Sequence, residues 1–413
     1  MTMTNPLTIA AGNRRRLFEE TKQRFRLPKG VVYLDGNSLG PLPVGVTERL
    51  AAAVEDEWGG QLIRAWNDAG WIDLPAKVGD RIAKLIDAPR GSVMVADSTS
   101  INLHKALAAA LKLRPDRRVI LSDSGNFPTD LYMAQGLVGS RGDLHELRIV
   151  APEDVEGALD DSVAVLMLTE VDYRTGRLHN MPTLTSAAHA VGALTVWDLA
   201  HSAGALPVDL TNCNADFAVG CGYKYLNGGP GAPAFIYVRP DHAERIDPAL
   251  SGWMGHAAPF AFDLDYHPAA GGSRMRVGTP PVLSLAALDT ALDVWDGIDI
   301  EAVRSASIEL SDLLIHEVER RCDGLGLTLA SPREGYRRGS QISFRFEEGY
   351  AAMQALIAEG VIGDFRAPDL MRFGITPLYI GEAEIIAAAE RIEAVLEGRL
   401  WDRPEFKKRA KVT

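Results

Sequence analysis

The hydrophobic pattern between residues 75 and 240 alternates between two periods. Short apolar runs typical of strands cover residues 93–97, 118–123, 163–169, 194–198 and 234–238. Segments with apolar residues every three or four positions lie between them, and the clearest is INLHKALAAALKL at 101–113. The run VAVLMLT at 163–169 is apolar up to its last residue, as expected of a strand covered on both faces. The alternation therefore predicts an α/β fold with a mostly parallel sheet covered by helices.

The pattern changes after about residue 285. Two long helical segments, at 284–296 and 301–322, are followed by strand-like segments and further helices. We interpret this part as a second, smaller α+β domain. The predicted organisation is an N-terminal segment at 1–60, a large domain at 61–284 and a small domain at 285–413. The N-terminal segment is expected to pack on the small domain or on a partner subunit.

Composition excludes several classes of protein. The 413 residues include 43 lysines and arginines against 55 acidic residues, and no basic cluster is long enough to follow a phosphate backbone, so nucleic acid is not an expected partner. The chain has no apolar stretch of membrane-spanning length and no secretory signal, so we expect a cytoplasmic protein without a membrane partner. Three cysteines without CxxC spacing predict neither a disulfide framework nor a metal site.

The stretch GYKYLNGGPG at 222–231 places one lysine, Lys224, between two tyrosines and a glycine-rich segment. Strand-type runs flank it, so Lys224 is predicted to lie on a tight connection whose glycines allow close approach to the backbone. An amine in such a place is suited to Schiff-base chemistry. A solvated loop lysine is the alternative interpretation.

Asp198 ends the apolar run LTVWD, and the carboxyl edge of a parallel sheet is where ligands bind. A buried carboxylate needs a cationic or donor partner, and His201 could orient it. The alternative is a helix N-cap. Because Lys224 follows 26 residues later, the pair suits pyridoxal phosphate: the lysine forms the Schiff base, and the aspartate keeps the pyridine nitrogen protonated.

Further polar groups follow the predicted strands. Ser98, Thr99 and Ser100 stand between a strand and a helix, where they would bind the phosphate of the cofactor or merely cap the helix. Phe127, with Asp130 close by in NFPTD, would stack on the cofactor ring or pack in the core.

Arg372 in MRFGITPLY lies inside an otherwise apolar strand, where an arginine is rarely buried unless it is paired. Its planar fork of donors matches a substrate carboxylate. An ion pair within the chain explains the same pattern.

Six motifs carry a resemblance to a known family: YLDGNSLG (33–40), NFPTDLY (126–132), WDLAHSAGA (197–205), GYKYLNGGPG (222–231), SGWMGH (251–256) and MRFGITPLY (371–379). Together they resemble kynureninase, a fold-type I pyridoxal-phosphate enzyme of the class V aminotransferase group. The motifs match in order from about residue 25 to residue 380. The resemblance implies a homodimer with the active site at the subunit interface.

The resemblance also implies roles for individual residues. Lys224, Asp198 and Tyr223 would be catalytic, with Tyr223 as proton donor in the later steps. The implied cofactor-binding residues are Thr99, Ser100, Phe127, Asp130, Thr169, Asp198, His201, Tyr223, Lys224 and, from the neighbouring subunit, Trp253 and Thr279. Arg372 would bind the substrate carboxylate. Asn67 falls where family members that prefer the 3-hydroxylated substrate look different, and with Trp66 beside it the segment resembles the bacterial type.

The implied reaction is hydrolysis of L-kynurenine to anthranilate and L-alanine by cleavage of the Cβ–Cγ bond, with 3-hydroxy-L-kynurenine as a weaker substrate. It would serve tryptophan catabolism in the kynurenine pathway or NAD biosynthesis. A cysteine desulfurase or selenocysteine lyase shares the fold and cofactor, but it would need a nucleophilic cysteine on a C-terminal loop, and no cysteine follows Cys322. A non-catalytic pyridoxal-phosphate-binding regulator is the third hypothesis.

Overall fold

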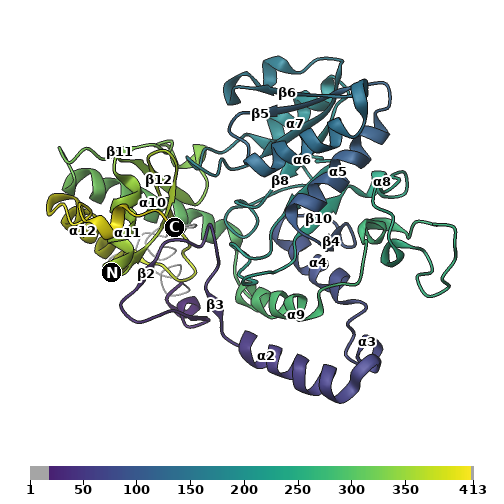
Figure 1. Ribbon diagram of the computed structural model, residues 1–413, viewed down its shortest axis with the longest axis horizontal. Helices are drawn as coiled ribbons and strands as arrows, with labels where there is room; N and C mark the ends of the chain where they lie inside the picture. The colour runs from purple at the N-terminus through teal and green to yellow at the C-terminus, as the bar shows by residue number, and fades with distance from the viewer. Residues whose placement is uncertain (1–17, 411–413) are drawn as a thin grey trace, which may run out of the picture. The chain divides into compact units, whose positions relative to one another are not determined.

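The computed structural model describes residues 18–410, which form two compact units (Figure 1). The large unit comprises residues 46–173 and 179–292, and the small unit comprises residues 18–45, 174–178 and 293–410. The sequence pattern put these boundaries at 60/61 and 284/285. The contacts of the backbone put them at 45/46 and 292/293.

The large unit is built on a seven-stranded sheet in the order β4-β10-β9-β8-β7-β5-β6. Its strands are β4 (Val93–Val95), β5 (Val119–Asp123), β6 (Glu146–Val150), β7 (Val163–Thr169), β8 (Leu194–Asp198), β9 (Phe217–Gly220) and β10 (Phe235–Val238). From β6 to β9 all neighbours are parallel, and β10 is antiparallel to both β9 and β4. The predicted mostly parallel sheet is therefore confirmed.

Helices cover this sheet because its strands are apolar on both faces. Every residue of β7 and β8 is buried, which requires cover on both sides. The helices are α4 (Leu74–Leu85), α5 (Thr99–Leu113), α6 (Pro128–Gly139), α7 (Met181–Ala190), α8 (Pro240–Ala243) and α9 (Val282–Ala291). Helix α5 packs across β7 to β10 with its buried Leu103 and Leu107, α7 packs on β8, and α4 on β4.

The apolar spacing of residues 44–58 predicts a helix. In the structure it begins as α2 (Val46–Ala52) and continues as a π-helix at Ala53–Gln61, a 3₁₀ turn at Leu62–Arg64 and α3 (Ala65–Asp68). The side-chain pattern predicts that this segment is helical. It does not predict the i→i+5 hydrogen bonds of the π-helix, because the pattern of apolar residues does not distinguish them from those of an α-helix. Other 3₁₀ turns lie at Gly142–Leu144, Pro152–Asp154, Glu156–Ala158, Trp253–Gly255, Gly271–Met275, Leu292–Trp295 and Gly335–Arg337.

The small unit contains an antiparallel sheet in the order β11-β12-β15-β14. Its elements are β11 (Thr328–Leu329), β12 (Gln341–Arg345), β14 (Asp364–Arg366), β15 (Leu370–Gly374), α10 (Ile300–Arg321), α11 (Gly349–Ala358), α12 (Glu382–Glu397) and α13 (Pro404–Lys407). Near the N-terminus, β1 (Phe25–Arg26) pairs with β3 (Leu42–Pro43), and β2 (Val32–Tyr33) pairs in parallel with β13 (Val361–Ile362). This second pairing joins residues 18–45 to the C-terminal part of the chain.

Among the described residues, no helix has both the length and the apolar composition that crossing a membrane requires.

Candidate active site

A small cavity of about 80 Å³ in the large unit gathers most of the predicted site residues. Its lining residues come from the ends of β7 and β8, the starts of α5 and α6, and the loop after β9: Thr99, Ser100, Phe127, Thr129, Asp130, Thr169, Tyr173, Asp198, Ala200, His201, Tyr223 and Lys224. The structure thus brings nine of the predicted cofactor-binding residues to the carboxyl edge of the parallel sheet, where ligands bind in this class of fold.

Lys224 lies on the connection between the antiparallel neighbours β9 and β10, as predicted. Close approach requires glycine there: a Cβ at Gly222 would lie 2.5 Å from the carbonyl oxygen of Pro233, and one at Gly228 would lie 2.7 Å from that of Gly222. The connection holds Lys224 half-buried, with Nζ 3.0 Å from Nε2 of His201. Lys224 is therefore not a solvated loop lysine.

Asp198 and Asp130 form a buried carboxyl pair beside Lys224. Burial raises the pKa of Asp198, and the Lys224 ammonium opposes that rise. Burial, followed by the charge of Asp198, holds the pKa of Asp130 well above its usual range. Residues 199–206 form turns rather than a helix, and Asp198 Oδ1 accepts from the backbone N–H of Ala200 at 2.7 Å, so the helix-cap interpretation is wrong. A cation bound next to this buried carboxyl pair would stabilise its negative charge.

The first turn of α5 faces the same cavity. Ser98 is the N-cap, and its hydroxyl accepts a hydrogen bond from the backbone N–H of Ile101 at 3.4 Å. Capping therefore falls on Ser98, while Thr99 and Ser100 line the cavity. Their hydroxyls and the partial positive charge of the helix N-terminus favour an anion at this place.

Two aromatic residues complete the lining. Phe127 is 41% exposed, so it is not a core residue, and its ring meets that of Tyr173 edge to face at 5.1 Å. Tyr223 is half-buried, and burial together with Cys221 and Asp198 raises the pKa of its phenol. Tyr223 therefore keeps its proton at neutral pH and is a hydrogen-bond donor at the cavity wall.

Three predicted residues of the large unit lie outside the cavity lining. Trp253 is exposed and contacts Phe260 edge to face at 5.7 Å. Thr279 and Asn67 are also exposed. Their roles stay predictions.

Arg372 belongs to β15 of the small unit and is almost fully buried. Its Nε donates to Oδ1 of Asp364 at 2.8 Å, its Nη2 donates to Oγ of Ser38 at 2.8 Å, and Ser38 Oγ donates to Oδ2 of Asp364 at 2.6 Å. The ion pair that the sequence left open therefore exists. Burial, and then the charge of Asp364, raises the pKa of nearby Asp35 to about 8.

Sequence reasoning missed several supporting groups. Asn126 accepts from the Thr169 hydroxyl at 2.5 Å and donates to Ser122 at 3.0 Å, so it orients a hydroxyl of the cavity lining. Asn126 stands in the NFPTD motif and could have been found there. Asp364 could not, because its pairing with Arg372 depends on two strands meeting in register.

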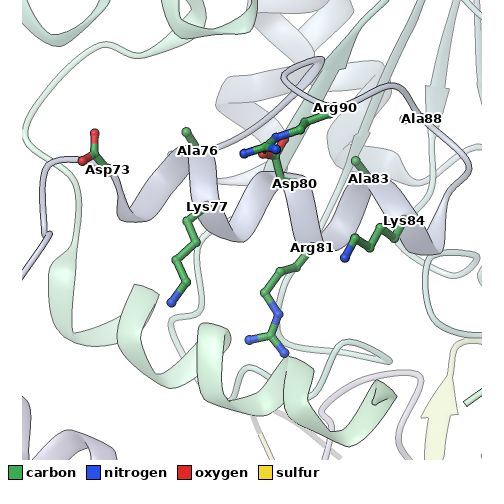
Figure 2. Close-up of a pocket in the computed structure, with 9 residues that line it drawn as sticks. All are labelled: Asp73, Ala76, Lys77, Asp80, Arg81, Ala83, Lys84, Ala88 and Arg90. Atoms are coloured by element: carbon green, nitrogen blue, oxygen red, sulfur yellow. The ribbon is translucent and has the colours of Figure 1, made fainter. Parts of the chain in front are cut away.

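A larger cavity, of about 520 Å³, runs along α4 (Figure 2). Figure 2 shows Lys77 and Arg81 extending from α4 toward a neighbouring helix, and both form ion pairs with Asp289 of α9, at 2.7 and 2.8 Å. Arg90 pairs with Asp80 at 2.9 Å. Since these cations are already paired with carboxylates, the size of the cavity does not make it the better candidate site.

The donor set of the small cavity fits pyridoxal phosphate. It offers an amine in Lys224 for the aldehyde, a buried carboxyl pair for a protonated ring nitrogen, and a helix start with two hydroxyls for the phosphate. The Lys224 ammonium opposes the raised pKa of each carboxyl of the pair. Within residues 18–410 no cluster of three or more His, Cys, Asp or Glu side chains could hold a metal ion.

The family model and the relatives with high sequence identity both point to one family. A family model described as the kynureninase C-terminal domain matches residues 303–392. The kynureninase of Pseudomonas fluorescens is 49% identical over 397 residues, which are 95% of each chain. Among solved structures, the cysteine desulfurase CsdA of Escherichia coli has a TM-score of 0.77 at 17% identity and covers 92% of this chain and 98% of its own.

A second similar structure is a C-DES variant that carries glycine covalently linked to its PLP cofactor. It has a TM-score of 0.76 at 18% identity and covers 92% of this chain and 98% of its own. Because both identities are below 25%, these two structures show only that the chain shares their fold, which is that of fold-type I pyridoxal-phosphate enzymes.

Proposed function

The chain belongs to the kynureninase family, and we propose that it hydrolyses L-kynurenine to anthranilate and L-alanine, with 3-hydroxy-L-kynurenine as a weaker substrate. The 49% identity to a kynureninase over 95% of both chains carries this proposal. The cavity supports it, because an amine, a carboxyl pair and a phosphate-type helix start converge there.

When bound, pyridoxal phosphate supplies a carbonyl carbon that reacts with amines and a ring that withdraws electrons. Lys224 would be the amine that holds it, and its free amine would be the base that removes the Cα proton of the substrate. His201, 3.0 Å from Lys224 Nζ, orients that amine. Asp198 would carry the negative charge that keeps the ring nitrogen protonated, and Asp130, with its raised pKa, would hold the single proton of the carboxyl pair.

The later steps need a group that binds the substrate carboxylate and a group that donates a proton. Arg372, whose Nε and Nη2 both donate to Asp364, is the arginine that we propose for the substrate carboxylate. Tyr223 keeps its proton and lines the cavity, so we assign it as the donor after water has added to the γ-carbonyl. Asn67 would help to select the substrate ring.

We further propose a homodimer in which Trp253 and Thr279 serve the neighbouring subunit's cofactor. Both are exposed and lie outside the lining of their own subunit's cavity. Large apolar side chains are exposed on the same unit at Trp58, Leu62, Ile63, Phe260, Phe262 and Leu264, as on surfaces that other chains cover. The free thiols of Cys213, Cys221 and Cys322 support a cytoplasmic location, where such thiols stay reduced.

The three cysteine thiols argue against the desulfurase hypothesis. Burial raises the pKa of Cys213 and of Cys322 to about 11 and also raises that of Cys221. Because the thiolate is the nucleophile, none of the three is activated for attack on a substrate sulfur.

Anthranilate fluorescence tests the proposal directly. The purified protein with pyridoxal phosphate should release anthranilate from L-kynurenine, faster than it processes 3-hydroxy-L-kynurenine, and should not release sulfide from L-cysteine. Lys224→Ala should lose both turnover and the absorbance band of the bound cofactor, because Lys224 is the one lysine among the described residues that line the cavity.

Lys84→Ala, on the exposed side of α4, is the matched control and should retain both properties. Sulfide release without anthranilate would favour the desulfurase hypothesis. Cofactor binding without turnover of any of the three substrates would favour the regulator.

A further inference from the structure

Lys105 is a fully buried lysine of α5 that has no place in the chemistry above. Its side chain is 0% exposed, and its Nζ donates to Oδ2 of Asp97 and to the backbone carbonyl of Met275, each at 2.7 Å. Burial lowers the pKa of Lys105, and the Asp97 carboxylate opposes that fall. Burying an ammonium group costs free energy unless it is paired. The two short hydrogen bonds therefore indicate that Lys105 Nζ is held at a fixed place in the fold.

The first partner, Asp97, shapes the turn that enters α5. Asp97 has φ +51°, a left-handed conformation that costs a non-glycine residue free energy and persists only where neighbours impose it. Its carbonyl accepts from the backbone N–H of Ala234 at 2.9 Å, and its carboxylate is held by Lys105. The next residues are the N-cap Ser98 and then Thr99 and Ser100, which line the cavity.

The second partner, Met275, belongs to a different segment of the chain, at 275–279. Met275 ends the 3₁₀ turn at Gly271–Met275, and Thr279 follows four residues later. The segment is tied to Trp253 through a hydrogen bond from the N–H of Met254 to the carbonyl of Val277 at 3.3 Å. Glycine at 252 permits this approach, since a Cβ there would lie 2.1 Å from the same carbonyl oxygen.

We infer that Lys105 is a positioning residue for the cofactor phosphate, because one ammonium fixes both the turn at 97–100 and the segment at 275–279. This inference rests on the proposed cofactor site. The first segment serves the phosphate of its own subunit, and the second bears Thr279, assigned above to the neighbouring subunit. Lys105 touches neither cofactor nor substrate, so it acts only through the residues that it orders.

Comparison of two ligands separates positioning from simple stabilisation. Apo-protein of Lys105→Met should bind pyridoxal phosphate about 10–100-fold more weakly, as removal of supporting partners does in metal sites. Its affinity for pyridoxal, which has the aldehyde and ring but no phosphate, should stay within about threefold, because Lys224, Asp198 and Asp130 are untouched. Both affinities are measured by absorbance titration of the apo-protein.

Lys112→Met is the matched control, because Lys112 lies on the same helix and pairs with Asp247 at 2.6 Å on the exposed surface. It should change neither affinity. An equal loss of affinity for both ligands in Lys105→Met, or no loss for either, would overturn the inference. If Lys105→Met does not fold, Asp97→Asn decides by the same comparison, since it keeps the shape of the turn and removes the charge.

The outcome is separable from that of the proposed function. If the unmodified protein binds no pyridoxal phosphate, the proposed function fails before any variant is compared. If it binds the cofactor and releases anthranilate while Lys105→Met loses affinity for both ligands alike, only the positioning role fails.

Discussion

Among single residues, Arg372, which we propose to bind the substrate carboxylate, depends on a partner that the sequence does not point to. Its guanidinium is held by Asp364 directly and by Ser38, which itself donates to Asp364. Asp364 is buried, and burial would raise its pKa, but the charges of Arg372 and Arg366 lower it instead. Asp364 therefore stays ionised and fixes the orientation of Arg372.

Asp364→Asn should raise KM for L-kynurenine roughly tenfold to a hundredfold, because hydrogen bonds to charged groups contribute about 1.5–3 kcal/mol. The value of kcat and the cofactor absorbance should change much less, since neither depends on the substrate carboxylate. Asp369→Asn is the control: Asp369 pairs at 3.1 Å with the half-exposed Arg345, which ends β12 of the same sheet. A loss confined to kcat in Asp364→Asn would contradict the positioning of Arg372.

Among the elements, the connection between β9 and β10 determines where Lys224 lies. A Cβ at Gly228 would lie 2.7 Å from Leu288 and 2.9 Å from the Cβ of Ala232, whereas Gly229, at φ +80°, has nothing within 4 Å. Gly228→Ala should cost about 1–3 kcal/mol of stability through overpacking and should weaken cofactor retention, because Gly222 and Lys224 must shift.

Gly229→Ala should cost about 1–2 kcal/mol through its left-handed backbone and should retain the cofactor. Thermal melts and cofactor release measured by gel filtration compare the two variants. Weaker retention in Gly229→Ala than in Gly228→Ala would show that backbone strain, rather than close packing, sets the position of Lys224.

The strands show how much of the fold can be predicted from the sequence. The predicted bounds of β7 and β8 match the structure because each is an apolar run that ends at a polar residue. Strand β6 was not predicted, because its exposed and half-buried residues give no apolar run. The antiparallel direction of β10 was not predicted either, because side-chain patterns carry no strand direction.

Some residues of the candidate site could likewise be predicted from the sequence, and others could not. Lys224, Asp198 and Thr99 were found because they stand at the ends of recognisable elements, and they meet in one cavity. Lys105 looked like an ordinary residue of an amphipathic helix. Its proposed positioning role depends on the distant carbonyl of Met275, which only the folded backbone brings within reach.

At the scale of the whole molecule, the proposed dimer makes a prediction that no single subunit can satisfy. Lys224 belongs to the cavity of its own subunit, whereas Trp253 and Thr279 are proposed to serve the cavity of the partner. A Lys224→Ala subunit should therefore complement a subunit that carries Trp253→Ala and Thr279→Ala. In their hybrid dimer, one site has an intact lysine from one chain and an intact tryptophan and threonine from the other.

Each variant alone should be nearly inactive. After the two are denatured together and refolded at equal concentration, random pairing makes half of the dimers hybrids with one complete site, so activity should return to about one quarter of wild type. Refolding each variant alone is the control. No recovery in a mixture shown by mass spectrometry to contain hybrids would mean that Trp253 and Thr279 act within their own subunit, since both sites of a hybrid would then lack an essential group.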